Sequence, residues 1–194
     1  MTVSIVTPTT HDRKEFNDRC VAMARNQTYG GIAEHLFDYS TDNIGTKRER
    51  LFRAAKGDII IHFDSDDIYL PQYVELAVNA ITQSKYGLLG LHNFPMHHVV
   101  NNTFHLFNNV GYIAEATYVY RRDGFCGFPN KHTNEGWQVM QNMKFASYHN
   151  PYFLATVHGG NTCGHKTIPL IKKLPQNEAA SLFNTFYSVT PDQR

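Results

Sequence analysis

The chain has 194 residues and a net charge of +1, with 18 basic and 17 acidic side chains, so its overall charge gives no reason to expect a nucleic-acid or membrane partner. Its hydrophobic fraction of 42% is that of an ordinary folded domain, and no apolar run approaches the ~20 residues that a membrane-spanning helix needs. The three cysteines, Cys20, Cys126 and Cys163, are widely spaced without a C-x-x-C pair, which argues against a disulfide framework and favours reduced thiols in a cytoplasmic protein.

The first half alternates short apolar strands with amphipathic helices. Strands are predicted at 3–6, 35–38, 58–63 and 87–91, and helices at 13–26, 46–55 and 71–83. The strand at 58–63 is apolar on both faces, as expected of a central strand in a sheet that is covered on both sides. This alternation predicts an α/β fold with a Rossmann-like, mostly parallel sheet flanked by helices.

The second half is less regular. It predicts a small antiparallel pair near 103–110 and 116–121, a helix near 135–145 and a strand near 153–158. A modest helical stripe in the tail at 175–194 could dock on the body of the protein or on a partner. No Gly/Ser-rich or Pro-rich linker separates these segments, so a single domain is expected.

Three carboxylates, Asp64, Asp66 and Asp67, directly follow the apolar strand at 58–63. The carboxyl ends of parallel strands are where open α/β sheets bind ligands. Carboxylates this close repel one another unless a cation compensates, and their hard oxygen atoms suit Mg²⁺ or Mn²⁺, which could bridge a diphosphate. The alternative is that Asp66 and Asp67 only cap the following helix.

Several motifs of the first half occur in a recognisable order. They are Val3-Ser4-Ile5-Val6-Thr7-Pro8-Thr9, Asn26-Gln27-Thr28-Tyr29, Ile44-Gly45-Thr46-Lys47-Arg48, Ala55-Lys56-Gly57-Asp58-Ile59-Ile60, Asp64-Ser65-Asp66-Asp67 and Pro71. In order and spacing they resemble family 2 glycosyltransferases over residues 2–85. The resemblance implies a GT-A fold and an inverting, metal-dependent transfer of a sugar from a nucleoside diphosphate donor, most often a UDP-sugar.

The same resemblance implies a set of donor-site residues. They are Thr7, Pro8, Thr9, Asp38, Arg48, Asp64, Ser65 and Asp66. The first three would line the base, and Asp38 would read its edge. Asp64 would face the ribose, Asp66 would ligate the metal on the diphosphate, and Arg48 would face the nucleotide or its diphosphate. The alternative for Arg48 is a solvated helix face.

Two further points of resemblance lie in the second half. Asn134-Glu135-Gly136-Trp137 is similar to the family's acidic pair that opens a helix beneath the acceptor site, with one acid of the pair present. Glu135 would be the general base, unless it is only a helix N-terminal glutamate. His158-Gly159-Gly160-Asn161-Thr162 is similar to a late histidine motif, so His158 would join Asp64 and Asp66 around the metal, unless it is a plain loop histidine.

The expected organisation is one GT-A domain over 1–194, with a nucleotide-sugar-binding half at 1–92, an acceptor and catalytic half at 93–167 and a C-terminal tail at 168–194. The expected partners are a nucleotide-sugar donor and an acceptor that the sequence leaves open: a glycan, a lipid-linked sugar, a protein or a modified nucleic-acid base. Two other functions stay in view. The lone Glu135 is compatible with a catalytically inactive sugar-nucleotide or glycan-binding module, and a nucleotidyltransferase is disfavoured because 7–11 contains no glycine.

Overall fold

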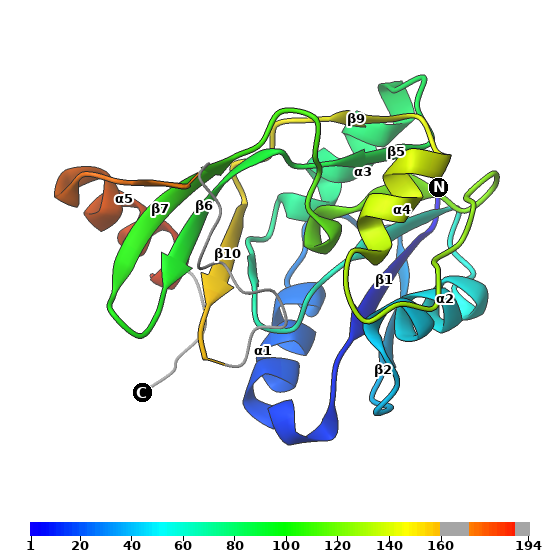
Figure 1. Cartoon of the computed structure of the whole chain (residues 1–194), viewed down its shortest axis with the longest axis horizontal. Coiled ribbons are helices and arrows are strands. Elements are labelled where there is room, and N and C mark those ends of the chain that lie inside the picture. The colour runs from blue at the N-terminus through cyan, green and yellow to red at the C-terminus, as the bar shows by residue number, and fades with distance from the viewer. Residues whose placement is uncertain (160–170, 189–194) are drawn as a thin grey trace.

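Two sheets lie side by side in the computed structural model, which describes residues 1–159 and 171–188 (Figure 1). The larger sheet has the strand order β2-β1-β3-β8-β5-β9. Its strands are β1 (Val3–Pro8), β2 (Ile32–Asp38), β3 (Ile59–His62), β5 (Leu88–Gly90), β8 (Val119–Arg121) and β9 (Phe145–Ser147). Strand β8 runs antiparallel to both of its neighbours, and the remaining pairings are parallel. The predicted α/β class with a mostly parallel sheet is therefore confirmed.

Helices cover both faces of this sheet. Helices α1 (Lys14–Arg25) and α3 (Tyr73–Gln83) pack on one face, with the core that contains Ile59 and Ile61. Helices α2 (Ile44–Ala54) and α4 (Glu135–Asn142) pack on the other face, with the core that contains Ile60. The alternation follows from the two-residue repeat of a strand, which sends successive side chains to opposite faces. It explains why the strand at 58–63 carries apolar side chains on both faces.

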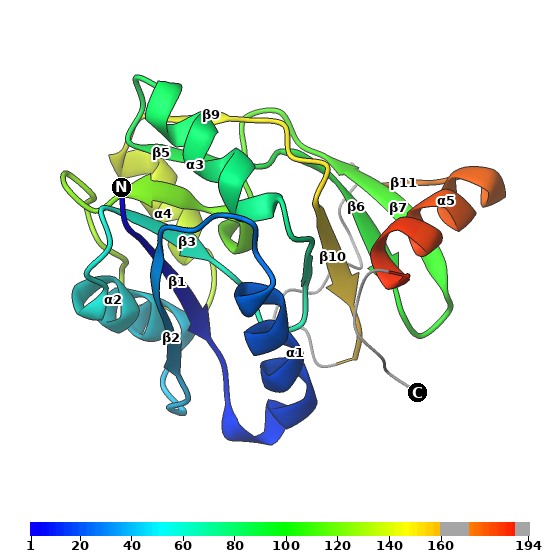
Figure 2. The same ribbon diagram turned by 180° about the vertical axis from the view of Figure 1, so that it is seen from behind.

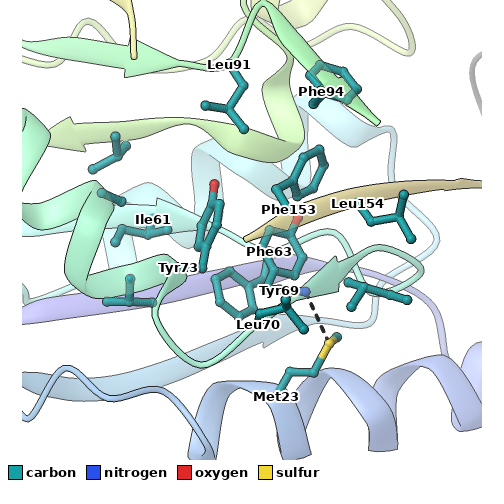
Figure 3. Packing of buried hydrophobic residues seen from close by; sticks show 14 of the residues in the cluster. Met23, Ile61, Phe63, Tyr69, Leu70, Tyr73, Leu91, Phe94, Phe153 and Leu154 are labelled. Atoms are coloured by element: carbon teal, nitrogen blue, oxygen red, sulfur yellow. Dashed lines mark hydrogen bonds between the residues drawn. The ribbon is translucent and has the colours of Figure 1, made fainter. Parts of the chain in front are cut away.

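The smaller sheet has the order β11-β7-β6-β10-β4, and its strand β10 lies beside α1 (Figures 1 and 2). Its strands are β4 (Ile68–Tyr69), β6 (Asn93–His98), β7 (Thr103–Asn108), β10 (Phe153–Val157) and β11 (Ile171–Lys173). The contact between the sheets is aromatic: the ring of Phe63, directly after β3, stacks on that of Tyr69 in β4 at 3.9 Å, and the ring of Phe153 in β10 lies 5.2 Å from that of Tyr69 (Figure 3). Met23 from α1 joins this core, and its Sδ accepts the Tyr69 N–H at 3.4 Å.

The predicted pairing of 103–110 with 116–121 is wrong. Strand β7 pairs with β6, and β8 enters the larger sheet between β3 and β5. Strand β6 escaped prediction because its sequence, Asn93 to His98, holds a proline and two histidines. Pro95 is tolerated because pairing with β10 begins one residue later, at Met96. The antiparallel element itself is present, but with different partners.

The tail helix is present as α5 (Gln176–Tyr187), and of the two alternatives it docks on the body of the protein. Phe186 is 1% exposed and belongs to the hydrophobic core that also holds Phe94 and Phe107 of the smaller sheet. The hydroxyl of Tyr187 lies 2.5 Å from Nδ1 of His97 in β6. Among the helices that the structure describes, none has the length and apolar character needed to cross a bilayer.

Candidate active site

The carboxyl ends of β1 and β3 meet at one edge of the larger sheet, because the two strands are parallel neighbours. The chain turns sharply after β3: the N–H of Asp67 donates to the carbonyl of Asp64 at 3.2 Å. Ser65 lies inside this turn and contacts Thr9, which follows β1, with 3.2 Å between their hydroxyl oxygens. The acidic turn 64–67 is thus tied to the end of the neighbouring strand.

Asp66 is the point where three elements converge. Its Oδ2 accepts from Nη2 of Arg13 at 2.7 Å, from the turn before α1, and lies 2.9 Å from Nε2 of His158, just after β10. The same Arg13 nitrogen lies 3.2 Å from His158 Nε2. The backbone carbonyl of Asp66 accepts from Arg19 at 2.6 Å and from Thr156 at 2.5 Å. These contacts fix the Asp66 carboxylate against the imidazole.

The Asp66 and His158 side chains are spaced as two ligands of one divalent ion would be. Bonds of about 2.1 Å in an octahedral shell place neighbouring ligand atoms about 3 Å apart, close to the 2.9 Å between Oδ2 and Nε2. Asp64, the third predicted ligand, directs its carboxylate to Arg48 instead. Within residues 1–159 and 171–188, no group of three or more His, Cys, Asp or Glu side chains is arranged to hold a metal. A divalent ion bound here would therefore have Asp66 and His158 as its two protein ligands, and oxygen atoms of a bound nucleotide sugar and of water would complete its coordination shell.

Asp67 has a structural position. Its side chain is buried, and its Oδ1 accepts the backbone N–H of Thr156 in β10 at 2.9 Å. Burial, followed by the charges of Asp66 and Asp64, raises the pKa of Asp67 well above its ordinary value. Asp67 thus joins the acidic turn to the smaller sheet and does not cap α3, which begins at Tyr73.

A second charged group surrounds Arg48 of α2, which is 3% exposed. Its Nη2 contacts the Asp64 carboxylate at 3.2 Å, its Nε contacts Oε1 of Glu135 at 3.2 Å, and its Nη1 donates to Nδ1 of His62 at 2.8 Å. Burial opposes the charged guanidinium, but Asp64, Glu135 and Glu115 outweigh it and raise the pKa of Arg48. Burial and then Arg48 lower the pKa of His62, so that its imidazole is neutral. Arg48 does not lie on a solvated helix face.

Glu115 is a member of this group that the sequence analysis missed. It opens a short 3₁₀ turn (Glu115–Thr117) and is partly buried, and its Oε2 accepts a hydrogen bond from the hydroxyl of Tyr112. Burial is the main cause that raises the pKa of Glu115 to about 7, and the nearby Glu135 adds to it. No motif surrounds Glu115, and the available signal was indirect: Gly136, where the family's second acid is expected.

The end of the site near β1 and β2 holds the predicted base-binding residues. Thr7 is buried, and its hydroxyl lies 2.8 Å from Nε2 of His35. Pro8 ends β1 and is paired with Asp38 at the end of β2. The Asp38 carboxylate is engaged on both oxygens, by Arg50 at 2.7 Å and by the N–H of Ser40 at 2.9 Å. The structure brings these residues together, and the Asp38 carboxylate forms an ion pair with Arg50.

The late histidine motif is described only in part. His158 and Gly159 follow β10, whereas Gly160, Asn161 and Thr162 lie outside the described residues, as does Cys163. Of the other two cysteines, Cys20 is buried and Cys126 is exposed, and both are free thiols.

The fold is that of a GT-A glycosyltransferase domain. The family model described as glycosyl transferase family 2 matches residues 18–146, and the chain belongs to this family. A comparison with curated protein sequences gives no significant match.

Several solved structures resemble the chain. Residues 1–349 of S. aureus TarS, in complex with UDP, align with a TM-score of 0.60 and 16% identity, covering 81% of this chain and 61% of that one. The mannosyltransferase PcManGT from Pyrobaculum calidifontis, in complex with GDP-Man and Mn²⁺, gives 0.63 and 10%, covering 82% and 58%. A mutant of Drosophila β-1,4-galactosyltransferase 7, in complex with manganese, UDP-Gal and xylobiose, gives 0.59 and 15%, covering 86% and 78%. The chain thus spans about three fifths of the first two proteins.

Proposed function

We propose that this protein transfers a sugar, of the hexosyl type, from a nucleoside diphosphate donor to an acceptor hydroxyl with inversion at the anomeric carbon. The observation that carries the proposal is the convergence of Arg13 and His158 on Asp66, at the carboxyl edge of the sheet in a family 2 chain. A UDP-sugar is the first donor to test, since two of the similar structures hold UDP or UDP-Gal.

The donor would lie along the strand ends, from the base to the diphosphate. Thr7, Pro8, Thr9 and Asp38 would surround the base, and the ion pair of Asp38 with Arg50 would orient that carboxylate. Asp64 and Ser65 would contact the ribose, and Asp66 would lie at the diphosphate. Arg48 would act through Asp64, because its guanidinium is buried behind that side chain.

Asp66 and His158 would hold a Mn²⁺ or Mg²⁺ ion beside Asp64, in agreement with their 2.9 Å separation and with the Mn²⁺ in two of the similar structures. The ion would neutralise the charge that develops on the leaving diphosphate. Arg13 is already placed on the same Asp66 oxygen, so its guanidinium adds a second positive charge at this end of the donor.

The acceptor would approach from the side of α4. Two carboxylates, Glu135 and Glu115, lie there, and either could take the proton from an acceptor hydroxyl as its oxygen attacks the anomeric carbon. The acceptor itself stays open among a glycan, a lipid-linked sugar, a protein and a modified nucleic-acid base. The single-domain organisation over 1–194, its division at 92 and 167, and a cytoplasmic location also stay predictions.

The proposal is tested by calorimetric titration of UDP, GDP, CDP and dTDP into the protein, first with Mn²⁺ and then with EDTA. We expect metal-dependent binding of one nucleotide, lost in Asp66→Ala and retained in Asp123→Ala, which removes an exposed carboxylate far from the acidic turn in sequence. If no nucleotide binds in the presence of metal, the donor site and the glycosyltransferase proposal are both wrong.

A catalytically inactive binding module is the second candidate, because Gly136 stands where the family has a second acid. Such a module would bind the nucleotide sugar but release no nucleoside diphosphate. Release of UDP or GDP from a donor sugar, with water as the acceptor, separates the two functions.

A further inference from the structure

Helix α4 opens with a glutamate and a glycine, Glu135 and Gly136. The family motif that this segment resembles has two acids. If the chain transfers a sugar as proposed above, the second acid of the motif is either absent from the site or supplied by another part of the chain.

The side chain of Glu115 fills the space beside Gly136. A Cβ atom placed on Gly136 would lie 2.1 Å from Cγ, 2.3 Å from Oε1 and 2.5 Å from Cδ of Glu115. Distances below 3.0 Å require one of the two groups to move, so a side chain at 136 would displace the Glu115 side chain from its present position. The carboxyl group of Glu115 thus occupies the volume in which an acidic side chain at 136 would begin.

Other contacts hold Glu115 in this place. The hydroxyl of Tyr112 donates to Oε2 of Glu115, and the hydroxyl of Tyr118 donates to the backbone carbonyl of Gly136 at 3.1 Å. The 3₁₀ turn itself is anchored by the hydrogen bond from Thr117 Oγ1 to the carbonyl of Ala114 at 2.7 Å. These bonds orient the Glu115 carboxyl group toward the first turn of α4.

We propose that Glu115 is the general base of this site, a carboxylate supplied from the 3₁₀ turn in place of the acid missing at Gly136. This inference rests on the proposed function and reassigns the role that the sequence analysis gave to Glu135. Glu135 becomes a positioning residue, which holds Arg48 between α2 and α4.

The two glutamates differ in their surroundings. The side chain of Glu135 is 7% exposed, and its Oε1 is bound by Nε of Arg48 at 3.2 Å. The carboxyl group of Glu115 instead accepts from the uncharged hydroxyl of Tyr112 and lies beside the first turn of α4. A base must come within about 3 Å of the proton donor and take up its proton, which favours the glutamate bound to a hydroxyl over the one bound to a guanidinium.

The proton affinity of Glu115 is consistent with this role. Burial, reinforced by Glu135 and opposed by Tyr112 and Arg48, raises its pKa to about 7. A base is most effective when its pKa lies near the working pH. The titratable and charged groups that face it are Arg48, His62, Tyr112, Tyr118 and Glu135.

The proposed step is a single displacement. The ionised Glu115 takes the proton of the acceptor hydroxyl, and the acceptor oxygen forms a bond to the anomeric carbon. The bond from that carbon to the diphosphate oxygen breaks, and its electron pair leaves with the nucleoside diphosphate. The products are the protonated Glu115, the glycosylated acceptor and the diphosphate.

The test compares Glu115→Gln with Glu135→Gln and with the control Glu75→Gln, an exposed position in α3. The assay measures nucleoside diphosphate release from UDP-glucose, UDP-GlcNAc and GDP-mannose, with water as acceptor, together with donor affinity by calorimetry. We expect Glu115→Gln to lower the release rate by about 100-fold or more with unchanged donor affinity. The wild-type rate should rise through a pH of about 7, and the residual rate of Glu115→Gln should lack this rise.

A swap of the acid tests the geometry directly. Glu115→Ala together with Gly136→Asp should recover at least about 10-fold of the rate that Glu115→Ala loses, because the truncated side chain frees the space beside 136. Gly136→Asp alone should be less stable than the wild type, since the Glu115 side chain must move away from its Cβ. No recovery in a swap variant that folds and binds donor would overturn the assignment.

The failures are distinguishable. If Glu115→Gln keeps the wild-type release rate, Glu115 is not the base while the proposed function stands. If the wild type binds donor but releases no nucleoside diphosphate, the assignment of any base is wrong and the binding module is favoured. If no donor binds, the proposed function itself fails.

Discussion

Replacing Arg48 with alanine should strongly destabilise the protein. The guanidinium is 3% exposed and is shared among Asp64, Glu135 and His62. Its removal leaves two carboxylates near each other without the cation between them. Removing one partner of a buried ion pair costs about 3–5 kcal/mol, since the other charge stays desolvated.

The exposure of the two carboxylates tells where this cost arises. Asp64 is 29% exposed and can regain water, whereas the side chain of Glu135 is 7% exposed and cannot. Most of the loss should therefore come from Glu135. A loss of at least about 3 kcal/mol would lower the midpoint of urea unfolding by about 1 M or more.

Arg53→Ala is a matched control on the same helix. Arg53 also pairs with a glutamate, Glu49, at 2.6 Å, but its side chain is 74% exposed. Exposed helical pairs of this kind contribute about 0.3–0.5 kcal/mol. Urea unfolding followed by circular dichroism measures both variants. If Arg48→Ala lowers the free energy of unfolding no more than Arg53→Ala does, the contacts of the buried Arg48 guanidinium do not stabilise the protein as described above.

Three further changes have definite expected results. Phe186→Ala should cost about 3 kcal/mol and speed hydrogen exchange in α5, whereas Phe183→Ala, at a 43% exposed position, should cost under about 1 kcal/mol. Gly45→Ala should lower the thermal midpoint, because its Cβ would lie 2.0 Å from the carbonyl of Pro129, while Gly30→Ala meets no atom within 4 Å and should not. The carboxyl of Glu115 ionises near 4.5 in the unfolded chain and near 7 in the folded one, so the folded state binds more protons between these values. Stability should therefore fall as pH rises across this window, by at most about 1.4 kcal/mol per unit, and urea unfolding of Glu115→Gln should lack that slope.

The sequence predicted β1, β2, β3 and β5 of the larger sheet because these strands are short apolar segments between turn signals, whereas it missed β9 and gave β8 the wrong partner. The acidic turn followed from the same logic, since Asp64 comes directly after the most apolar strand. The smaller sheet was harder to predict. Strand β4 has only two residues, and β6 carries Pro95, so neither gives a periodic signal.

Side-chain partners in the site were less predictable than its position. Asp66 and His158 were expected together, and they meet at 2.9 Å although 92 residues separate them in the sequence. Arg13 and Glu115 were missed because each reaches the site from a 3₁₀ turn, where no repeat or motif marks the residue. Their contribution depends on tertiary contacts that a single sequence does not encode locally.

The position of β8 has a consequence for how this chain can be synthesised. Residues 119–121 pair with both β3 and β5, although those strands end at 62 and 90. During translation β3 therefore has one unpaired edge, and β5 has two, until β8 has emerged, and such edges are sites for aggregation. A ribosome-bound fragment that stops before β8 should need a chaperone, whereas one that extends past Arg121 can pair β3 and β5 with β8.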